Sequence, residues 1–318
     1  MERTPAPRRD PIRVVAPAKL NLSLAVLARR PDGFHEIESL MVPVSLHDVL
    51  VVRPLPGPEI ELVVRFAAEL PPEVARDVPT DGTNLVVRAA RMLAEEAGVA
   101  GGLAIELEKH VPSGAGLGGG SSDAAAVLAA AARAWGLDWP AERLADLGGR
   151  LGSDVPWFFA GGAALAAGRG ERIVPVSGLP DLAAVVAWPA AGLSTGAVYA
   201  ACTPEPQRRG EAAALAAALA AGGLAAARPL LHNSLEAPAR RLCPDIDRLL
   251  DDLAAAGGFC PRLTGSGSAC FALARSPAEA EAVAARIASL DGDRIGPRWS
   301  VRAVRLTPPA GGLDRLTA

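Results

Sequence analysis

The chain has 318 residues, enough for two medium-sized domains or one large one, and we expect two. Apolar residues make up 50% and charged residues 21%, the balance of a packed globular protein rather than a disordered chain. A net charge of -3 with 4% aromatic residues offers neither the basic surface nor the stacking platforms of a nucleic-acid-binding protein.

No segment of the sequence has the features of a targeting signal or a membrane anchor. Residues 1–10 are polar and charged and lack the apolar core of a secretion signal. The most apolar run, residues 212–227, is mostly alanine, so we expect a helix too weakly hydrophobic to span a bilayer. The four cysteines are far apart without a Cys-x-x-Cys pair, which argues against a disulfide framework or a metal cage. We therefore expect a cytoplasmic protein with reduced thiols and no membrane partner.

The basic residues are strongly biased toward arginine. Of 32 basic residues, only Lys19 and Lys109 are lysines. Each lysine therefore marks a position where a compact ammonium group could be required. For Lys109, which ends an expected strand, we favour chance retention over a functional requirement.

The first part of the chain predicts a series of strands followed by a helix. Residues 20–27 alternate apolar and polar side chains, which predicts a strand that carries Lys19, Asn21 and Ser23 on one face. Thr83 is expected to cap a helix that ends at a left-handed glycine, Gly98. Further strands are expected at residues 37–44, 49–53 and 60–66.

The next elements are a strand, a glycine-rich loop and a helix. Residues 103–107 alternate as a strand, and residues 112–120 are too rich in glycine for regular structure. Ser121 or Ser122 is expected to cap an alanine-rich helix that runs to about Trp135.

Two more helices complete this part of the chain. One is expected to begin near Pro140, a residue suited to the first helical turn. Ser153 or Asp154 is placed to cap a short helix with Pro156 in its first turn, so Asp154 should lie near a positive helix end.

After a glycine stretch at residues 168–170 the pattern restarts, and we expect the domain boundary there, between residues 1–167 and 168–318. Together with the mixed elements this predicts an α+β protein. A helix is expected from Pro277. Strands are expected at residues 173–176, 182–188, 269–273 and 300–306.

The glycine-rich loop reads PSGAGLGGGSS and is the most informative segment. Its five glycines let the backbone approach a ligand and turn N–H groups toward it, and the following helix adds its partial positive charge. These features predict a phosphate site. Its residues are Pro112, Ser113, Gly114, Ala115, Gly116, Leu117, Gly118, Gly119, Gly120, Ser121 and Ser122.

Two common nucleotide motifs fit this loop poorly. Gly114, Gly116 and Gly119 have the dinucleotide spacing G-x-G-x-x-G, but the acidic residue about twenty positions later would fall near Asp138, between two helices. Gly114 and Gly119 also have the Walker A spacing, but Gly120 stands where that motif requires lysine.

The segment GLGGGSS, which opens a helix after a strand, resembles the ATP-binding loop of the GHMP kinases. The stretches APAKLNL (16–22), PDGFHE (31–36) and LGSDVPWF (151–158) resemble one branch of that superfamily, which acts on a cytidyl diphosphate sugar alcohol. The stretch LTGSGSACF (263–271) is similar to the third superfamily motif, whose loop, here Gly265, Ser266 and Gly267, closes the site.

The resemblance implies a two-domain fold and a reaction. The N-terminal domain, residues 1–167, would bind ATP and resemble the second domain of ribosomal protein S5. The C-terminal domain, residues 168–318, would be ferredoxin-like. ATP would phosphorylate the 2-hydroxyl of the sugar alcohol, a step in non-mevalonate isoprenoid precursor synthesis.

By the same resemblance, Asp154 would be the catalytic base and Lys19 would face it and the transferred phosphoryl group. A carboxylate near a helix N-terminus stays ionised and can accept a proton from a hydroxyl. Mg²⁺ would arrive with ATP, and Ser121 or Ser122 is the natural hydroxyl for that ion. No protein-only metal site is expected.

The resemblance also assigns residues to the substrate. Asn21 would contact it, and His35 would read the edge of the cytosine. Phe34 and Tyr199 would enclose the cytosine ring, with Thr195 nearby. The usual residue at position 34 is tyrosine, so a hydrogen bond made by its hydroxyl would be lost here.

Three alternatives remain open at this point. Another GHMP kinase, such as homoserine kinase, shares the loop, but residues 32–35 favour a cytidyl substrate. A GHMP-fold regulator that binds ATP without catalysis would not need both Lys19 and Asp154. A dehydrogenase is the third alternative. The sequence does not predict the number of copies in the assembly.

Overall fold

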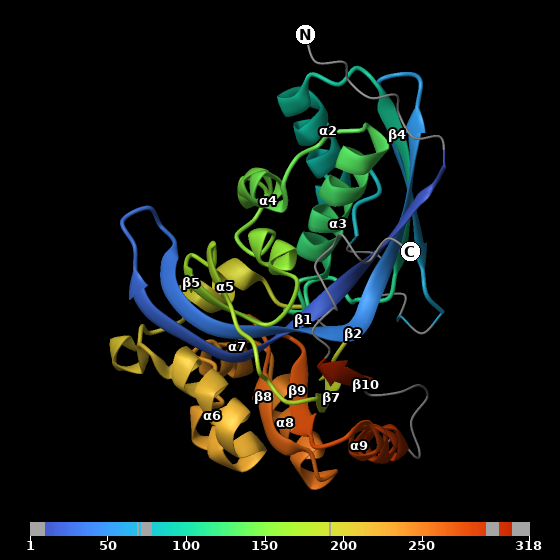
Figure 1. Ribbon diagram of the computed structural model, residues 1–318. Coiled ribbons are helices and arrows are strands. Elements are labelled where there is room, and N and C mark those ends of the chain that lie inside the picture. Colours follow the sequence, from blue (N-terminus) through green and yellow to red (C-terminus); the bar gives the residue numbers. More distant parts are fainter. Residues whose placement is uncertain (1–9, 69, 71–77, 191, 291–298, 307–318) are drawn as a thin grey trace.

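The structure is a computed structural model that describes residues 10–68, 70, 78–190, 192–290 and 299–306. Nine of the ten N-terminal residues examined for a targeting signal thus lie outside the described residues. The fold consists of a six-stranded sheet and a four-stranded sheet, each with helices packed against it (Figure 1). The mixed architecture confirms the expected α+β class.

Two long strands, β1 (Ile12–Arg29) and β2 (His35–Leu55), pair antiparallel and curve through the whole molecule (Figure 1). Their residues are largely apolar and buried, so both strands have partners on each face. The two separate strands expected at residues 37–44 and 49–53 are parts of the single strand β2. Register shifts in β1, such as the one between Pro17 and Lys19, let the pair continue through irregularities.

The first sheet has the order β3–β4–β2–β5–β6, and β1 pairs with β2 beside this path. Helices α2, α3 and α4 lie together on one side of it (Figure 1). The remaining strands are β3 (Ile60–Phe66), β4 (Gly102–Lys109), β5 (Ala164–Gly168) and β6 (Arg172–Pro175). The helices are α2 (Leu85–Ala97), α3 (Gly119–Ala134), α4 (Ala141–Gly149) and the 3-10 helix η1 (Pro156–Ala160).

Helix α2 ends as expected but begins with a different cap. Gly98 has φ 64° and closes the helix in the left-handed conformation, which confirms that prediction. The expected cap, Thr83, is wrong. Asn84 is the cap, because its side-chain oxygen accepts a hydrogen bond of 2.9 Å from the backbone N–H of Val86.

Helix α3 begins three or four residues earlier than expected. Gly118, with φ 73°, turns the chain into the helix, so neither Ser121 nor Ser122 is the cap. Only glycine adopts this left-handed conformation at little cost, and the helix therefore starts without a side-chain cap.

The short helix η1 is likewise not capped by Ser153 or Asp154. The residue that precedes it is Val155, and no side chain caps its N-terminus. The prediction is wrong because the chain turns into η1 one or two residues later than expected. Asp154 instead directs its carboxylate toward Lys19.

The second sheet has the order β10–β7–β9–β8, with antiparallel neighbours. In chain order this is strand, helices, strand, strand, helix, strand, which is the ferredoxin-like pattern predicted for the C-terminal half. The strands are β7 (Leu182–Trp188), β8 (Phe259–Leu263), β9 (Cys270–Ala274) and β10 (Ser300–Leu306). The helices are α5 (Thr195–Ala200), η2 (Pro206–Arg208), α6 (Glu211–Ala227), η3 (Arg228–Leu230), α7 (Glu236–Leu242), α8 (Asp245–Ala255) and α9 (Pro277–Ser289).

The glycine stretch at residues 168–170 lies within the first sheet. It forms the turn between β5 and β6, which pair as a hairpin. The boundary expected between residues 167 and 168 would therefore cut this hairpin. Because the first sheet ends at Pro175 and the second begins at Leu182, we place the proposed boundary in the connection between them.

The segment Pro206–Leu230 is more apolar than expected. An 18-residue stretch within it has a mean hydropathy of 1.5, so by length and composition alone the segment could cross a membrane, and the expectation that it is too weakly hydrophobic is wrong. In the structure, however, Gly223 has φ 63° and ψ -156° and breaks α6. Leu215 and Leu219 are buried in the same core cluster as side chains of β1 and β2. The segment is thus packed as an outer helix of the fold.

The two halves share one apolar core. Leu20 and Leu40, from β1 and β2, pack in the same cluster as Trp188 and Phe271 of the second sheet. All four side chains are fully buried. The long strands of the first sheet are therefore covered by the second sheet, and the cavity described next lies where the halves meet.

Candidate active site

A cavity of about 930 Å³ collects residues from both halves of the chain. It contains almost all of the residues predicted for the site, but Ser122 and Gly267 do not line it. The predicted residues that line it are Lys19, Asn21, Phe34, His35, Pro112, Ser113, Gly114, Ala115, Gly116, Leu117, Gly118, Gly119, Gly120, Ser121, Asp154, Thr195, Tyr199, Gly265 and Ser266.

Lys19 and Asp154 meet in the lining of this cavity. The Lys19 Nζ lies 3.8 Å from Oδ2 of Asp154. The Lys19 side chain is almost fully buried, whereas that of Asp154 is 37% exposed and can be reached from the cavity. Burial lowers the pKa of Lys19 from its ordinary value, and the neighbouring Asp154 carboxylate opposes that shift. The ammonium and the carboxylate thus form a partly accessible ion pair.

Asn21 holds Lys19 in place. The Lys19 Nζ donates a hydrogen bond to Oδ1 of Asn21, which confirms that the two side chains share a face of β1. The Asn21 Nδ2 donates to Oγ of Ser39 at 2.8 Å, and its backbone N–H donates to Oγ1 of Thr264 at 3.0 Å. Asn21 is therefore fixed by both β2 and the loop after β8, and it orients the lysine.

The glycine-rich loop closes on the loop at residues 264–267. A Cβ placed on Gly116 would lie 2.3 Å from the carbonyl oxygen of Thr264 and 2.9 Å from the backbone nitrogen of Gly267. The backbone N–H of Ala269 donates to the carbonyl of Ala115 at 3.0 Å. Only glycine at position 116 allows the two loops to approach this closely.

Gly118 faces protein rather than open space. A Cβ on this residue would lie 3.0 Å from Cγ of Lys19 and 3.1 Å from Cζ of Phe158. A side chain at position 118 would therefore disturb Lys19 directly. By contrast, a Cβ on Gly114 would meet nothing within 4 Å.

Aromatic rings gather at the other end of the cavity. The rings of His35 and Tyr199 contact each other, with centroids 5.1 Å apart and planes tilted by 41°. Phe34 is 48% exposed, and the Arg169 guanidinium lies over its ring at 4.8 Å. Among the described residues no ring contact joins Phe34 to Tyr199. Both residues line the cavity, and their enclosure of a cytosine ring stays a prediction.

His35 carries an orphaned polar atom at this end of the cavity. Its Nε2 is buried and has no hydrogen-bond partner among the described residues. Burial lowers the pKa of His35, and the positive charge of Arg29 adds to the effect, so the ring favours its neutral form. A neutral imidazole with a free ring nitrogen can hydrogen-bond to the edge of a ligand.

Three arginines of the cavity were missed by the sequence reasoning. Arg29 donates to the carbonyls of Ala200 and Cys202, and Arg30 pairs with acidic residues of its own turn. Arg169 stands between two glycines, in the stretch where the sequence predicts only a domain boundary. Among the described residues no acidic group lies within 4 Å of the Arg169 guanidinium, although its charge acts on the Asp32 carboxylate; Arg169 lines the cavity.

Arg169 bridges the two ends of the cavity. Its guanidinium lies over Phe34, beside His35 in the chain. Its neighbour Gly170 lies against Asp154, because a Cβ there would be 3.7 Å from Oδ1 of that carboxylate. The hairpin turn between β5 and β6 thus passes from the aromatic end to the ion pair.

Thr195 fastens the second half of the chain to this site. It is the first residue of α5, which Ser194 caps. The hydroxyls of Thr195 and Ser266 are hydrogen-bonded at 2.9 Å. Thr195 therefore contacts the loop at residues 264–267 and also lines the cavity.

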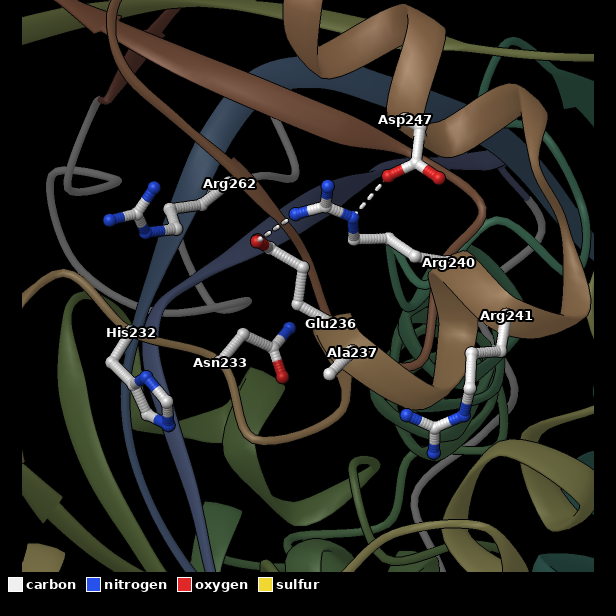
Figure 2. A pocket seen from close by; sticks show the side chains of 8 residues that line it. All are labelled: His232, Asn233, Glu236, Ala237, Arg240, Arg241, Asp247 and Arg262. Carbon is white, nitrogen blue, oxygen red and sulfur yellow. Dashed lines mark hydrogen bonds and ion pairs between the residues drawn. The ribbon is translucent and has the colours of Figure 1, made fainter.

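A second cavity of about 520 Å³ is lined by residues of α7 and α8 and of the segments beside them (Figure 2). Its Asn233 donates from Nδ2 to the carbonyls of Leu263 and Gly265 at 2.9 and 2.8 Å. The Glu236 carboxylate accepts from the backbone N–H of Leu263 at 2.9 Å. Figure 2 shows Arg240 between this carboxylate and that of Asp247. Asn233 and Glu236 thus hold the end of β8 and the start of the loop at residues 264–267, and the sequence analysis did not identify them.

The candidate site has a hydroxyl but no metal cage. Ser121 lines the cavity, whereas the Ser122 side chain is fully buried and its Oγ has no hydrogen-bond partner among the described residues. Among all residues that the structure describes, no group of three or more His, Cys, Asp or Glu side chains is arranged to hold a metal ion. Any ion at this site would need ligands from a bound nucleotide as well.

Models of two known domains match this chain. The GHMP kinases N terminal domain matches residues 84–162, and the GHMP kinases C terminal domain matches residues 215–291. The first match includes the glycine-rich loop and Asp154, and the second includes the loop at residues 264–267.

Named relatives cover most of the chain. A 4-diphosphocytidyl-2-C-methyl-D-erythritol kinase of Rhodopirellula baltica is 44% identical over 86% of this chain and 90% of the relative. One of Pelotomaculum thermopropionicum is 39% identical over 88% of this chain and 95% of the relative. A crystal structure of 4-(cytidine 5'-diphospho)-2C-methyl-D-erythritol kinase superposes with a TM-score of 0.72 and 38% identity, covering 92% of this chain and 98% of that one.

A more distant structure shares only the fold. The mevalonate kinase of L. major, solved with R-mevalonate, is 16% identical and has a TM-score of 0.72, covering 96% of this chain and 99% of that one. The fold alone therefore does not identify the substrate.

Proposed function

Because the chain belongs to the GHMP kinases, in the group of 4-diphosphocytidyl-2-C-methyl-D-erythritol kinases, we propose that ATP phosphorylates the 2-hydroxyl of 4-diphosphocytidyl-2-C-methyl-D-erythritol here. This reaction is a step of non-mevalonate isoprenoid precursor synthesis, and we propose a cytoplasmic location for it. The observation that carries the proposal is the Lys19–Asp154 pair at 3.8 Å in the cavity that the glycine-rich loop also lines.

In this proposal Asp154 is the catalytic base. Its carboxylate is accessible from the cavity and can accept the proton of a hydroxyl as that oxygen attacks the terminal phosphorus of ATP. Lys19 keeps the carboxylate oriented and places a positive charge beside the oxygens on which negative charge gathers. Asn21 acts mainly by holding Lys19, in addition to the substrate contact implied by resemblance.

The glycine-rich loop provides the proposed triphosphate site. Gly114, Gly116 and Gly118 have positive φ angles, so the loop turns its backbone sharply at each of them. Such turns direct N–H groups into a shared concavity that binds anions, and α3 adds its positive end. The loop at residues 264–267 covers Gly116 and closes this region from the second half.

The proposal includes Mg²⁺ carried by ATP. The donor set fits an ion held mostly by phosphate oxygens, because the protein offers the Ser121 hydroxyl and the Asp154 carboxylate in the cavity but no cage. When bound, the ion would neutralise charge on the phosphates. Of the two serines considered, Ser121 is the proposed ligand, since Ser122 does not reach the cavity.

The other end of the cavity is proposed to hold the cytidyl diphosphate. The free Nε2 of His35 is suited to the cytosine edge, and the Tyr199 ring offers a face for stacking. Arg169 lies between this end and Asp154, where the diphosphate of a substrate spanning both ends would be. A guanidinium whose acidic neighbour, Asp32, lies beyond ion-pair distance is well suited to phosphate oxygens.

A kinase assay with several alcohols tests this proposal. Purified protein with ATP and Mg²⁺ should release ADP with 4-diphosphocytidyl-2-C-methyl-D-erythritol and give a phosphorylated product by mass spectrometry. Release with homoserine instead would favour the homoserine kinase alternative. Absence of ADP with every alcohol, despite ATP binding, would favour a regulator.

A further inference from the structure

Lys109 is a buried ammonium held by two carboxylates. Its side chain is 4% exposed, and its Nζ donates to Oδ2 of Asp48 and, at 2.7 Å, to Oδ2 of Asp123. Both carboxylates are themselves buried. A charge in such a position is costly unless it is paired, and removal of one partner leaves the other uncompensated. Chance retention of this lysine, favoured by the sequence, therefore does not fit the structure.

The ion pair joins the two ends of the glycine-rich loop. Lys109 is the last residue of β4, and Asp123 lies in the first turns of α3, so the loop leaves from one partner and returns at the other. Asp48 in β2 completes the connection. Its Oδ1 accepts from the backbone N–H groups of His110 and Val111, at 2.5 and 2.8 Å, and so holds the first residues of the loop.

The space around the ammonium accounts for lysine in a chain that otherwise uses arginine. A Cβ placed on Gly119 would lie 3.3 Å from Nζ of Lys109 and 2.9 Å from Cγ1 of Val111. A planar guanidinium is larger than an ammonium and needs several acceptors in its own plane. The packing between the loop and the end of β4 leaves room for the compact group.

We propose that Lys109 and Asp123 are positioning residues for the nucleotide, because their ion pair ties the two ends of the loop at the separation that lets its N–H groups converge on a triphosphate. This inference rests on the proposed nucleotide site. Neither side chain lines the cavity, so both act through the backbone of the loop. Displacement by about 1 Å of groups that position a substrate can cost about 100-fold in rate.

Asp123→Ala is the test, because it removes one end of the connection and leaves Lys109 paired with Asp48. Alanine also suits the alanine-rich helix α3. Circular dichroism and thermal unfolding should show a folded protein. Its affinity for a non-hydrolysable ATP analogue should fall by about 10-fold or more, a loss of about 1.4 kcal/mol. The KM for the alcohol substrate should change by less than about twofold, because mutations at distant, independent sites affect each other little.

Two further variants make the result specific. Asp123→Asn keeps an oxygen that accepts from Lys109 and should restore most of the affinity for the analogue. Arg53→Met is the matched control, because Arg53 pairs with Glu106 across the same two strands, β2 and β4, on the exposed surface. It should leave analogue binding unchanged.

Equal analogue affinity in Asp123→Ala and the unmodified protein would overturn the proposal. So would an Asp123→Asn protein that binds no better than Asp123→Ala, or an equal loss for both substrates. If Asp123→Ala does not fold, Asp123→Ser provides the same comparison with a shorter polar side chain. Analogue binding is measured without the alcohol, so a wrong alcohol substrate would appear only in the turnover assay of the unmodified protein.

Discussion

The Lys19 ammonium lies 3.8 Å from the Asp154 carboxylate although the two residues are 135 positions apart in the chain. β1 brings the lysine, and the turn before η1 brings the carboxylate. Because only the carboxylate is substantially exposed, one partner can accept a proton from a bound hydroxyl while the other remains fixed.

Asp154→Asn should lower kcat at least about 100-fold, the low end for loss of a general base, with the fold intact. Asparagine keeps the shape of the side chain but does not accept the proton. Steady-state kinetics and circular dichroism measure the two effects. A turnover number close to that of the unmodified protein would contradict the role of Asp154.

Gly116→Ala should separate the two loops that close the site. Its Cβ would meet the Thr264 carbonyl oxygen at 2.3 Å, so one loop has to move. We expect kcat/KM for ATP to fall by about 100-fold or more, as for a misplacement near 1 Å. Gly114→Ala is the control, since both glycines have positive φ but the Cβ at position 114 meets open space. Equal losses in the two variants would show that backbone strain, rather than the clash, is responsible.

Asn233→Ala should loosen the loop at residues 264–267. It removes the donor to the Leu263 and Gly265 carbonyls, at a cost of about 1–3 kcal/mol in the free energy of unfolding. Denaturant unfolding measures this loss, and kcat should fall with it. Arg240→Gln removes an ion pair whose arginine is 46% exposed and should cost at most about 1 kcal/mol. A larger loss in Arg240→Gln than in Asn233→Ala would contradict this ranking.

Arg169→Gln should raise the KM for the cytidyl substrate by about 10-fold, because it removes a charged donor to the diphosphate. The KM for ATP should stay within about twofold, since ATP is proposed to bind at the other loop. The matched control is Arg172→Gln, on the same hairpin, which pairs with Glu36 and does not line the cavity. If both variants raise the KM equally, the effect comes from the net charge of the hairpin.

Asp123 should make stability depend on pH. Burial raises the pKa of Asp123 above its ordinary value of 3.8, although the Lys109 ammonium opposes the shift. As pH rises above that value, the folded protein therefore keeps a proton longer than the unfolded chain, and its stability should fall until Asp123 has ionised. Asp123→Asn does not titrate, so its thermal midpoint should decline less as the pH is raised from about 4. Parallel declines in the two proteins would contradict this prediction.

Much of the fold could be predicted because apolar periodicity fixes which residues are buried. The strands at residues 182–188 and 300–306 and the helix from Pro277 have the predicted bounds. The caps could not be predicted in the same way. Several residues before each helix could cap it, and the backbone turn that selects one is not specified by the sequence pattern. Asn84 caps α2 with its side chain, whereas α3 begins at the left-handed turn of Gly118.

The site was predictable where one motif contains the interacting residues. Lys19 and Asn21 share a strand face, so their contact follows from a period of two. Contacts between distant segments were not predictable. One example is the hairpin that places Arg169 over Phe34. Another is the meeting of β2, β4 and α3 at Lys109. Both are tertiary arrangements, and short-range sequence patterns carry no information about them.

The shared core of β1 and β2 also affects how the chain can fold during synthesis. Leu20 and Leu40 are made early, but Phe271, which helps to bury them, is made near the end. Until then a nascent chain exposes an apolar surface of the kind that aggregates or recruits chaperones. For the same reason, the N-terminal half expressed alone should be poorly soluble, whereas coexpression with the C-terminal half should restore solubility.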